Sequence, residues 1–174
     1  MIKNNNNMAL EVENVKILTG NFRNFAGEPD RFNPQGGKRY FNFEIDDAEI
    51  ANQLLNDGWR VKTWAPHDEN ADPRYYLKVT IGRYVQFARM VQSNGDWVDL
   101  IDERAPQGVD PQEALGCLDR ADIRFADLVI TPRRHDDGMF TAYLKSGWFI
   151  IEEDPFAHKY ASAAKSVDTE AVPF

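Results

Sequence analysis

The chain has 174 residues and a formal net charge of −8, and 43% of its residues are hydrophobic. This length suits one domain with a sizeable core and a tail, and no apolar run of about 18 residues marks a membrane span. The first residues, MIKNNNNMAL, lack the apolar stretch of a secretion signal, so we expect an intracellular protein. The single cysteine, Cys117, excludes an internal disulfide framework and a cysteine-based zinc site, and we expect it to be buried.

The N-terminal quarter predicts a polar lead followed by short extended pieces. Residues 1–8 contain four consecutive asparagines and predict a disordered lead. Residues 10–18 predict a first strand and residues 22–25 a second, shorter one. Residues 27–37 are too rich in glycine and proline to be regular, so we expect a loop there.

Residues 38–45 alternate, which predicts a strand with Phe41, Phe43 and Ile45 on the core side. A helix is expected to begin at Asp46 or Asp47, because aspartate is a favoured N-cap, and to end at Gly58, because glycine tolerates the left-handed backbone of a helix end.

Further strands are predicted over residues 59–64, 74–84, 85–91 and 97–101. Asn94-Gly95 between the last two is a strong hairpin signal. Asp110-Pro111 predicts the start of a short helix.

A long hairpin is predicted over residues 126–153, with its turn at residues 133–138. On the returning strand, alternation predicts that one set of side chains faces the core and the other faces outward. The predicted core set is Phe140, Ala142, Leu144, Trp148 and Ile150, and the predicted outer set is Thr141, Tyr143, Lys145 and Phe149.

The pattern as a whole predicts an all-β or β-rich fold with one main helix. An OB-like small barrel is the first interpretation, because closure hides sheet edges, and a β-sandwich is the alternative. The predicted boundaries are the lead at 1–8, the folded domain at 9–155 and a flexible tail at 156–174.

The outer faces of four predicted strands each carry an aromatic ring beside a cation. Bases stack on such rings and phosphates pair with the cations, which is typical of sequence-tolerant binding to single-stranded nucleic acid. The alternative is that aromatic residues simply favour strands and that lysine and arginine are solvated there. The candidate DNA-binding residues are Lys38, Tyr40, Arg60, Lys62, Trp64, Tyr76, Lys78, Tyr143 and Lys145.

Metal and catalytic signals are weaker. The triplets His67-Asp68-Glu69 and His135-Asp136-Asp137 are rich in ligand atoms, but adjacent side chains on a loop do not converge, so we interpret both as solvated turns. The sequence has no phosphate-binding glycine loop, nucleophile elbow or deaminase pattern, so we predict neither a cofactor nor an enzyme.

The last seven residues, DTEAVPF, resemble the C-terminal tip of bacterial single-stranded DNA-binding proteins, an acidic run that ends in Ile-Pro-Phe. In that family the terminal phenylalanine and its carboxylate dock in a basic pocket on replication and repair proteins, while the acids steer the tip. The resemblance implies these partner-binding roles for Asp168, Glu170, Pro173 and Phe174. This chain departs from the pattern by having two separated acids and valine in place of isoleucine.

The body resembles a family of bacteriophage OB-fold single-stranded DNA-binding proteins. The resemblance implies a protein of phage replication or recombination that acts in the host cytoplasm. Two other functions stay open, namely an acidic DNA mimic that inhibits a host nuclease or defence enzyme, and RNA binding by the same rings. The segments that carry the resemblance are residues 21–45, 55–66, 73–84, 118–132 and 142–160.

Overall fold

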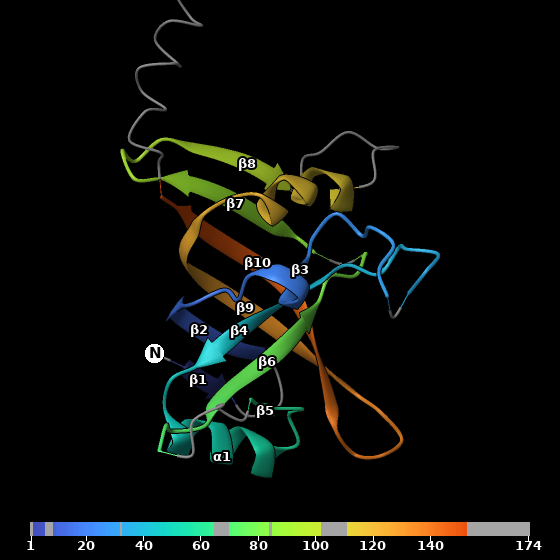
Figure 1. The fold of residues 1–174 in the computed structure, drawn as a ribbon, viewed down its shortest axis with the longest axis vertical. Helices are drawn as coiled ribbons and strands as arrows, with labels where there is room; N and C mark the ends of the chain where they lie inside the picture. Colours follow the sequence, from blue (N-terminus) through green and yellow to red (C-terminus); the bar gives the residue numbers. More distant parts are fainter. Residues whose placement is uncertain are drawn as a thin grey trace, which may run out of the picture.

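A computed structural model describes residues 2–5, 9–31, 33–64, 70–83, 85–101 and 111–152. This described part of the chain is strand-rich, with one α-helix and two short 3₁₀ helices (Figure 1). No helix in these ranges is long and apolar enough to cross a membrane. The elements are β1 (Ile2–Asn5), β2 (Ala9–Val15), η1 (Gly20–Phe22), β3 (Arg23–Asn24), β4 (Tyr40–Ile45), α1 (Ala48–Asp57), β5 (Lys62–Trp64), β6 (Arg74–Thr80), β7 (Phe87–Gln92), β8 (Trp97–Ile101), η2 (Pro111–Asp119), β9 (Ile123–Arg134) and β10 (Phe140–Ile151).

Five strands form an OB-like, partly open barrel, which confirms the predicted fold class. Hydrogen-bonded neighbours follow the order β2, β9, β10, β6 and β4, and β10 runs parallel to β6. The strand ladder does not close, but an isolated bridge joins Ile17, just after β2, to Phe43 in β4. Two backbone hydrogen bonds of 2.9 Å, from Leu18 N to Asn42 O and from Glu44 N to Lys16 O, hold this seam. A partly open five-stranded barrel is the usual form of the OB fold.

The β7–β8 hairpin extends the barrel at one end, whereas α1 lies at the other (Figure 1). The hairpin is attached through β10, whose first half pairs with β6 in the barrel and whose second half pairs in parallel with β7. The predicted Asn-Gly turn is confirmed, since Gly95 has φ 94° and its N–H donates to Gln92 O over 2.9 Å.

The helix has the predicted ends. The Asp47 carboxylate accepts the N–H of Glu49 over 2.8 Å, which satisfies one of the unpaired donors of the first turn. Gly58 ends the helix with φ 105°, a conformation that costs glycine little.

Three phenylalanines form the centre of the core. The Phe25 ring stacks on Phe41 with centroids 5.0 Å apart, and both rings meet the Phe149 ring edge-on. All three side chains are fully buried. Truncating such a ring costs about 3–5 kcal/mol, so this cluster is a large part of the stability.

The predicted faces of β10 are wrong beyond Leu144. Strand pairing with β9 shifts between Leu144 and Ser146, which leaves Lys145 as an extra residue in a β-bulge. The bulge reverses the alternation, so Phe149 enters the core and Trp148 is 37% exposed. Ile150, also predicted to face the core, shares the outer face of the sheet with Trp148.

Two smaller predictions are also wrong. Residues 2–5 form β1, which pairs with β2, although a disordered lead was predicted over residues 1–8. Cys117 is exposed near the end of η2 rather than buried. The triplet at residues 67–69 and the tail at residues 156–174 lie outside the described residues.

Candidate nucleic-acid interface

The outer face of β4, β5 and β6 carries most of the predicted site. Register sets the arrangement, because Lys62 lies opposite Tyr76 and Trp64 lies opposite Arg74 on neighbouring strands. Residues directly opposite each other in a ladder point to the same side of the sheet. The rings and cations of three strands therefore share one surface.

An aromatic cluster occupies one part of this surface. Phe22, from the turn η1, lies over the strands with its ring 5.4 Å from that of Trp64 and 5.3 Å from that of Tyr76. The side-chain amide of Asn42 donates to the Phe22 carbonyl over 2.8 Å and so fixes the turn against β4. The rings are thus held in place before any ligand arrives.

The sequence did not predict Phe22 as a site residue. It lies in a three-residue 3₁₀ turn, where neither strand nor helix periodicity indicates which way a side chain points. The sequence placed Phe22 at the start of the short strand predicted over residues 22–25, whereas the structure places it in η1 and begins β3 at Arg23.

Arginine and glutamate border the cluster. Arg74 lies over the Trp64 ring at 4.7 Å and binds Glu44 through two hydrogen bonds of 2.9 and 2.8 Å. The hydrogen bonds from Arg74 lower the pKa of the Glu44 carboxyl below its usual value. The charge of Glu44 is therefore compensated locally and repels an approaching phosphate less.

Three lysines converge next to the rings. Lys78 lies over the Tyr40 ring with its Nζ 4.5 Å from the centroid. Its pKa is lowered, first by burial and then by the positive charges of Lys62 and Lys38. A lysine that loses proton affinity to neighbouring cations marks a local positive potential, which favours an anion.

Tyr40 is held in place by its hydroxyl. The hydroxyl is 3.3 Å from both the Asp30 carboxylate and the Asn21 carbonyl, and it can donate to either. Burial, and then the Asp30 charge, raise the pKa of Tyr40, so the phenol stays protonated. The ring keeps one face toward Lys78.

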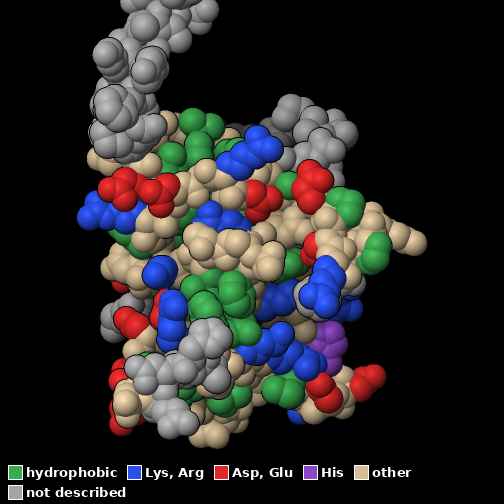
Figure 2. Space-filling view, viewed as in Figure 1, with side chains coloured by type: hydrophobic (Ala, Val, Ile, Leu, Met, Phe, Trp, Pro, Cys, Tyr) green, Lys and Arg blue, Asp and Glu red, His purple; other side chains and the backbone are tan. Residues whose placement is uncertain are grey.

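A groove of about 480 Å³ runs between these side chains. Figure 2 shows hydrophobic side chains bordered by Lys and Arg near the middle of this face. The groove is lined by Asn21, Phe22, Asp30, Asn33, Lys38, Tyr40, Asn42, Lys62, Tyr76 and Lys78. We call it the β4–β6 groove.

Three predicted residues lie apart from this groove. Tyr143 and Lys145 line a second cavity of about 590 Å³, where Tyr143 is separated from Tyr40 by Thr80 on the intervening strand. Arg60 forms an ion pair of 2.7 Å with Asp137 in the β9–β10 turn. Its charge is thus already compensated within the protein.

The turn at residues 135–137 has a structural role. Besides pairing with Arg60, the Asp137 carboxylate accepts the N–H of Met139 over 2.9 Å. Among the described residues, no group of three His, Cys, Asp or Glu side chains is close enough to hold a metal ion.

Comparison with known proteins gave one match. A family model described as "Putative phage ssDNA-binding domain" matches residues 2–172. No curated protein and no solved structure matches the chain.

Proposed function

The chain belongs to the phage single-stranded DNA-binding domain family, and we propose that it holds single-stranded DNA in the β4–β6 groove. The main support for this proposal is that three rings and three lysines meet over the outer face of β4, β5 and β6. The rings are Phe22, Tyr40 and Tyr76, and the lysines are Lys38, Lys62 and Lys78. In OB folds this part of the barrel is the usual place for oligonucleotides. Binding of single-stranded DNA is the shared property of the family, whereas the residues that bind it here are our proposal.

Each type of side chain has a distinct role in this proposal. Trp64, Tyr76 and Phe22 offer surfaces on which unpaired bases stack, at about 1–3 kcal/mol for each base. Lys62 and Lys78 contact the phosphates. Because every base has a stacking face, this arrangement gives little sequence preference, and because paired bases hide their faces, it favours single strands over duplexes.

The proposed biological role is coating of single-stranded DNA during phage replication or recombination. In this proposal the C-terminal tip recruits partner proteins with Phe174 as the anchor, which is supported by the resemblance of the tip to that of bacterial single-stranded DNA-binding proteins. Pro173, Glu170 and Asp168 support that anchor. These residues lie outside the described ranges, so this part rests on the sequence alone.

A matched pair of variants tests the groove. Trp64→Ala removes an exposed ring of the aromatic cluster beside the groove, and Trp97→Ala removes an exposed ring from β8, on another surface. Fluorescence anisotropy with labelled oligo-dT, oligo-rU and duplex DNA measures affinity. We expect Trp64→Ala to weaken oligo-dT binding by about 1–3 kcal/mol and Trp97→Ala to leave it unchanged. Equal losses in both variants would place the DNA elsewhere.

The ligand series separates the remaining functions. Tighter binding of oligo-dT than of duplex supports stacking in a groove. Equal affinity for oligo-rU would extend the function to RNA, since stacking does not read the 2′-hydroxyl. An unchanged anisotropy with all three ligands would instead favour the acidic inhibitor of a host enzyme.

Deletion of Phe174 tests recruitment. Anchors that fill a pocket carry most of the energy of a short contact, so loss of this single residue is expected to abolish capture of replication proteins. Affinity for oligo-dT is expected to stay the same. If the deletion removes DNA binding but not capture, the roles of tail and body are reversed.

A further inference from the structure

A second surface with many rings lies at the end of the barrel that carries the β7–β8 hairpin. Strand register places one set of side chains on the same outer face of β8, β7, β10 and β9. We call it the β7–β10 face. Its members are Trp97, Asp99, Phe87, Arg89, Val91, Trp148, Ile150, Phe125 and Asp127.

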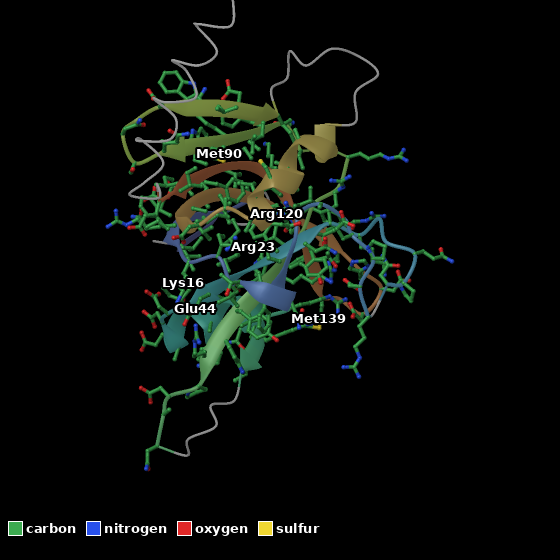
Figure 3. The ribbon with its side chains drawn as sticks, turned by 45° about the horizontal axis from the view of Figure 1, so that its top comes forward. Lys16, Arg23, Glu44, Met90, Arg120 and Met139 are labelled. Carbon is green, nitrogen blue, oxygen red and sulfur yellow. The ribbon has the colours of Figure 1, made fainter. Side chains whose placement is uncertain are left out.

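The rings of this face contact one another and remain exposed. The Phe87 ring lies 4.9 Å from that of Trp148, and Arg89 lies over the rings of Phe87 and Trp97 at 5.0 and 5.1 Å. Trp97 is 59% exposed and Trp148 is 37% exposed. On the opposite side of β7, Met90 packs against the core (Figure 3). Among the described residues, the sheet here has one side packed against the core and one apolar side with exposed rings.

The face is comparable in size to the largest apolar patch of a typical monomer, and such patches are often functional. Four strands spaced about 4.8 Å apart, over three rows of side chains, cover roughly 400 Å². Monomers rarely expose larger contiguous apolar patches, whereas a small, weak interface buries about this much on each partner. The face is large enough for a weak contact and too small for an obligate one.

The charges of the face argue against DNA as its ligand. Its one cation, Arg89, is bound to Asp99 over 2.6 Å, and Asp127 lies in the same cross-strand row. One cation beside two carboxylates gives no attraction for phosphate. The β4–β6 groove, with three lysines, has the opposite character.

The order of charges along the row matches a second copy of the same chain. Arg89 on β7, Trp148 on β10 and Asp127 on β9 are successive neighbours across the sheet. A two-fold axis that runs along β10 at Trp148 exchanges the positions of the two flanking strands. It therefore sets Arg89 of each copy, which also pairs with Asp99, above Asp127 of the other, whose Oδ1 also accepts the Asn14 N–H over 2.8 Å. The Trp148 rings lie between these charges.

We propose that the β7–β10 face is a homodimer interface in which two copies pack face to face about this axis. An isologous contact requires such a self-complementary row. The net charge of −8 makes copies repel each other over most of their surface. The face holds four rings, one cation and two carboxylates, a formal net charge of only −1, which reduces that repulsion where the copies meet. The contact does not depend on DNA.

The test compares two tryptophans of matched exposure. Trp148 is 37% exposed on the β7–β10 face, and Trp64 is 39% exposed in the aromatic cluster beside the groove. Sedimentation velocity of the full chain without DNA, from roughly 1 μM to 200 μM, measures the monomer–dimer equilibrium across the range expected for a weak dimer. Anisotropy with oligo-dT measures DNA binding separately.

We expect the wild-type chain to dimerise over this range, and Trp148→Ser to weaken dimerisation at least tenfold while binding oligo-dT normally. Trp64→Ser should give the reverse result. Circular dichroism checks folding, and Trp97→Ser replaces Trp148→Ser if the latter misfolds, because the more exposed ring contributes less to the fold.

Three results would overturn the proposal. The first is that the wild-type chain stays monomeric at the highest concentration. The second is that Trp148→Ser and Trp64→Ser weaken dimerisation equally. The third is that the Trp148→Ser chain loses DNA binding but still dimerises. The last result would make the face a DNA surface. A failure of the groove would appear only in the anisotropy of Trp64→Ser, so the two proposals fail independently.

Discussion

Phe22→Ala tests whether the aromatic cluster is set in place before DNA arrives. The ring contacts Trp64 and Tyr76 at 5.4 and 5.3 Å, and each such pair contributes about 0.5–1.5 kcal/mol. Loss of both contacts leaves the Trp64 and Tyr76 rings less constrained, although Arg74 still lies over Trp64, and ordering them on DNA then costs up to about 1–3 kcal/mol. Since 1.4 kcal/mol is about tenfold in affinity, we expect binding to weaken by about fivefold to 150-fold.

The fold should survive this change. No residue of η1 is buried, and the hydrogen bond from Asn42 goes to the Phe22 backbone, which alanine retains. Anisotropy with labelled oligo-dT measures affinity, and thermal melting checks stability. Phe87→Ala is the matched control, because its ring is paired with Trp148 on the other surface at 4.9 Å. An unchanged affinity for Phe22→Ala, or an equal loss for Phe87→Ala, would refute the role of the cluster.

Three further results are expected. Phe41→Ala should lower the free energy of unfolding in urea by about 3–5 kcal/mol, because the ring is fully buried. Lys62→Gln should reduce the slope of log affinity against log salt by about 0.7, the contribution of one single-strand phosphate. Arg60→Gln should reduce that slope less, because Arg60 is already paired with Asp137. Lys78→Met should raise the melting temperature at neutral pH while weakening DNA binding. The lowered pKa of Lys78 means that the folded state disfavours the charged lysine. This destabilises the fold at any pH below the lowered pKa, and the destabilisation disappears as the pH rises above the ordinary lysine pKa. The melting difference between Lys78→Met and wild type should therefore shrink at alkaline pH.

The sequence predicted the strands of the groove because their ladders are regular. β4 and β6 pair over six consecutive residues without a shift, so alternation placed Phe41 and Phe43 in the core and Tyr76 and Lys78 outside. The ends of α1 were equally predictable, since Asp47 and Gly58 act through local backbone geometry. Local rules suffice where no distant contact changes them.

Distant contacts explain what the sequence did not predict. Arg60 has the charge of a DNA ligand and lies in the strand predicted over residues 59–64, but β5 begins only at Lys62, and Asp137, 77 residues away, pairs with Arg60. Phe22 joins the cluster because a 3₁₀ turn folds over β4, which no periodicity encodes. Trp148 and Phe149 exchanged places because alternation assumes a strand without an extra residue.

The bulge at Lys145 also constrains how this strand can evolve. Before it, β10 presents Tyr143 outward beside the barrel strands, and after it the strand presents Trp148 outward beside the hairpin. Substitutions on either side can accumulate separately, because neither half depends on the other for its outward residues. A change in the length of the strand is not tolerated in the same way, because removal of one residue near the bulge would turn Phe149 outward and Trp148 inward. Relatives that share this arrangement should therefore vary in residue type around Lys145 but conserve the number of residues between Leu144 and Gly147.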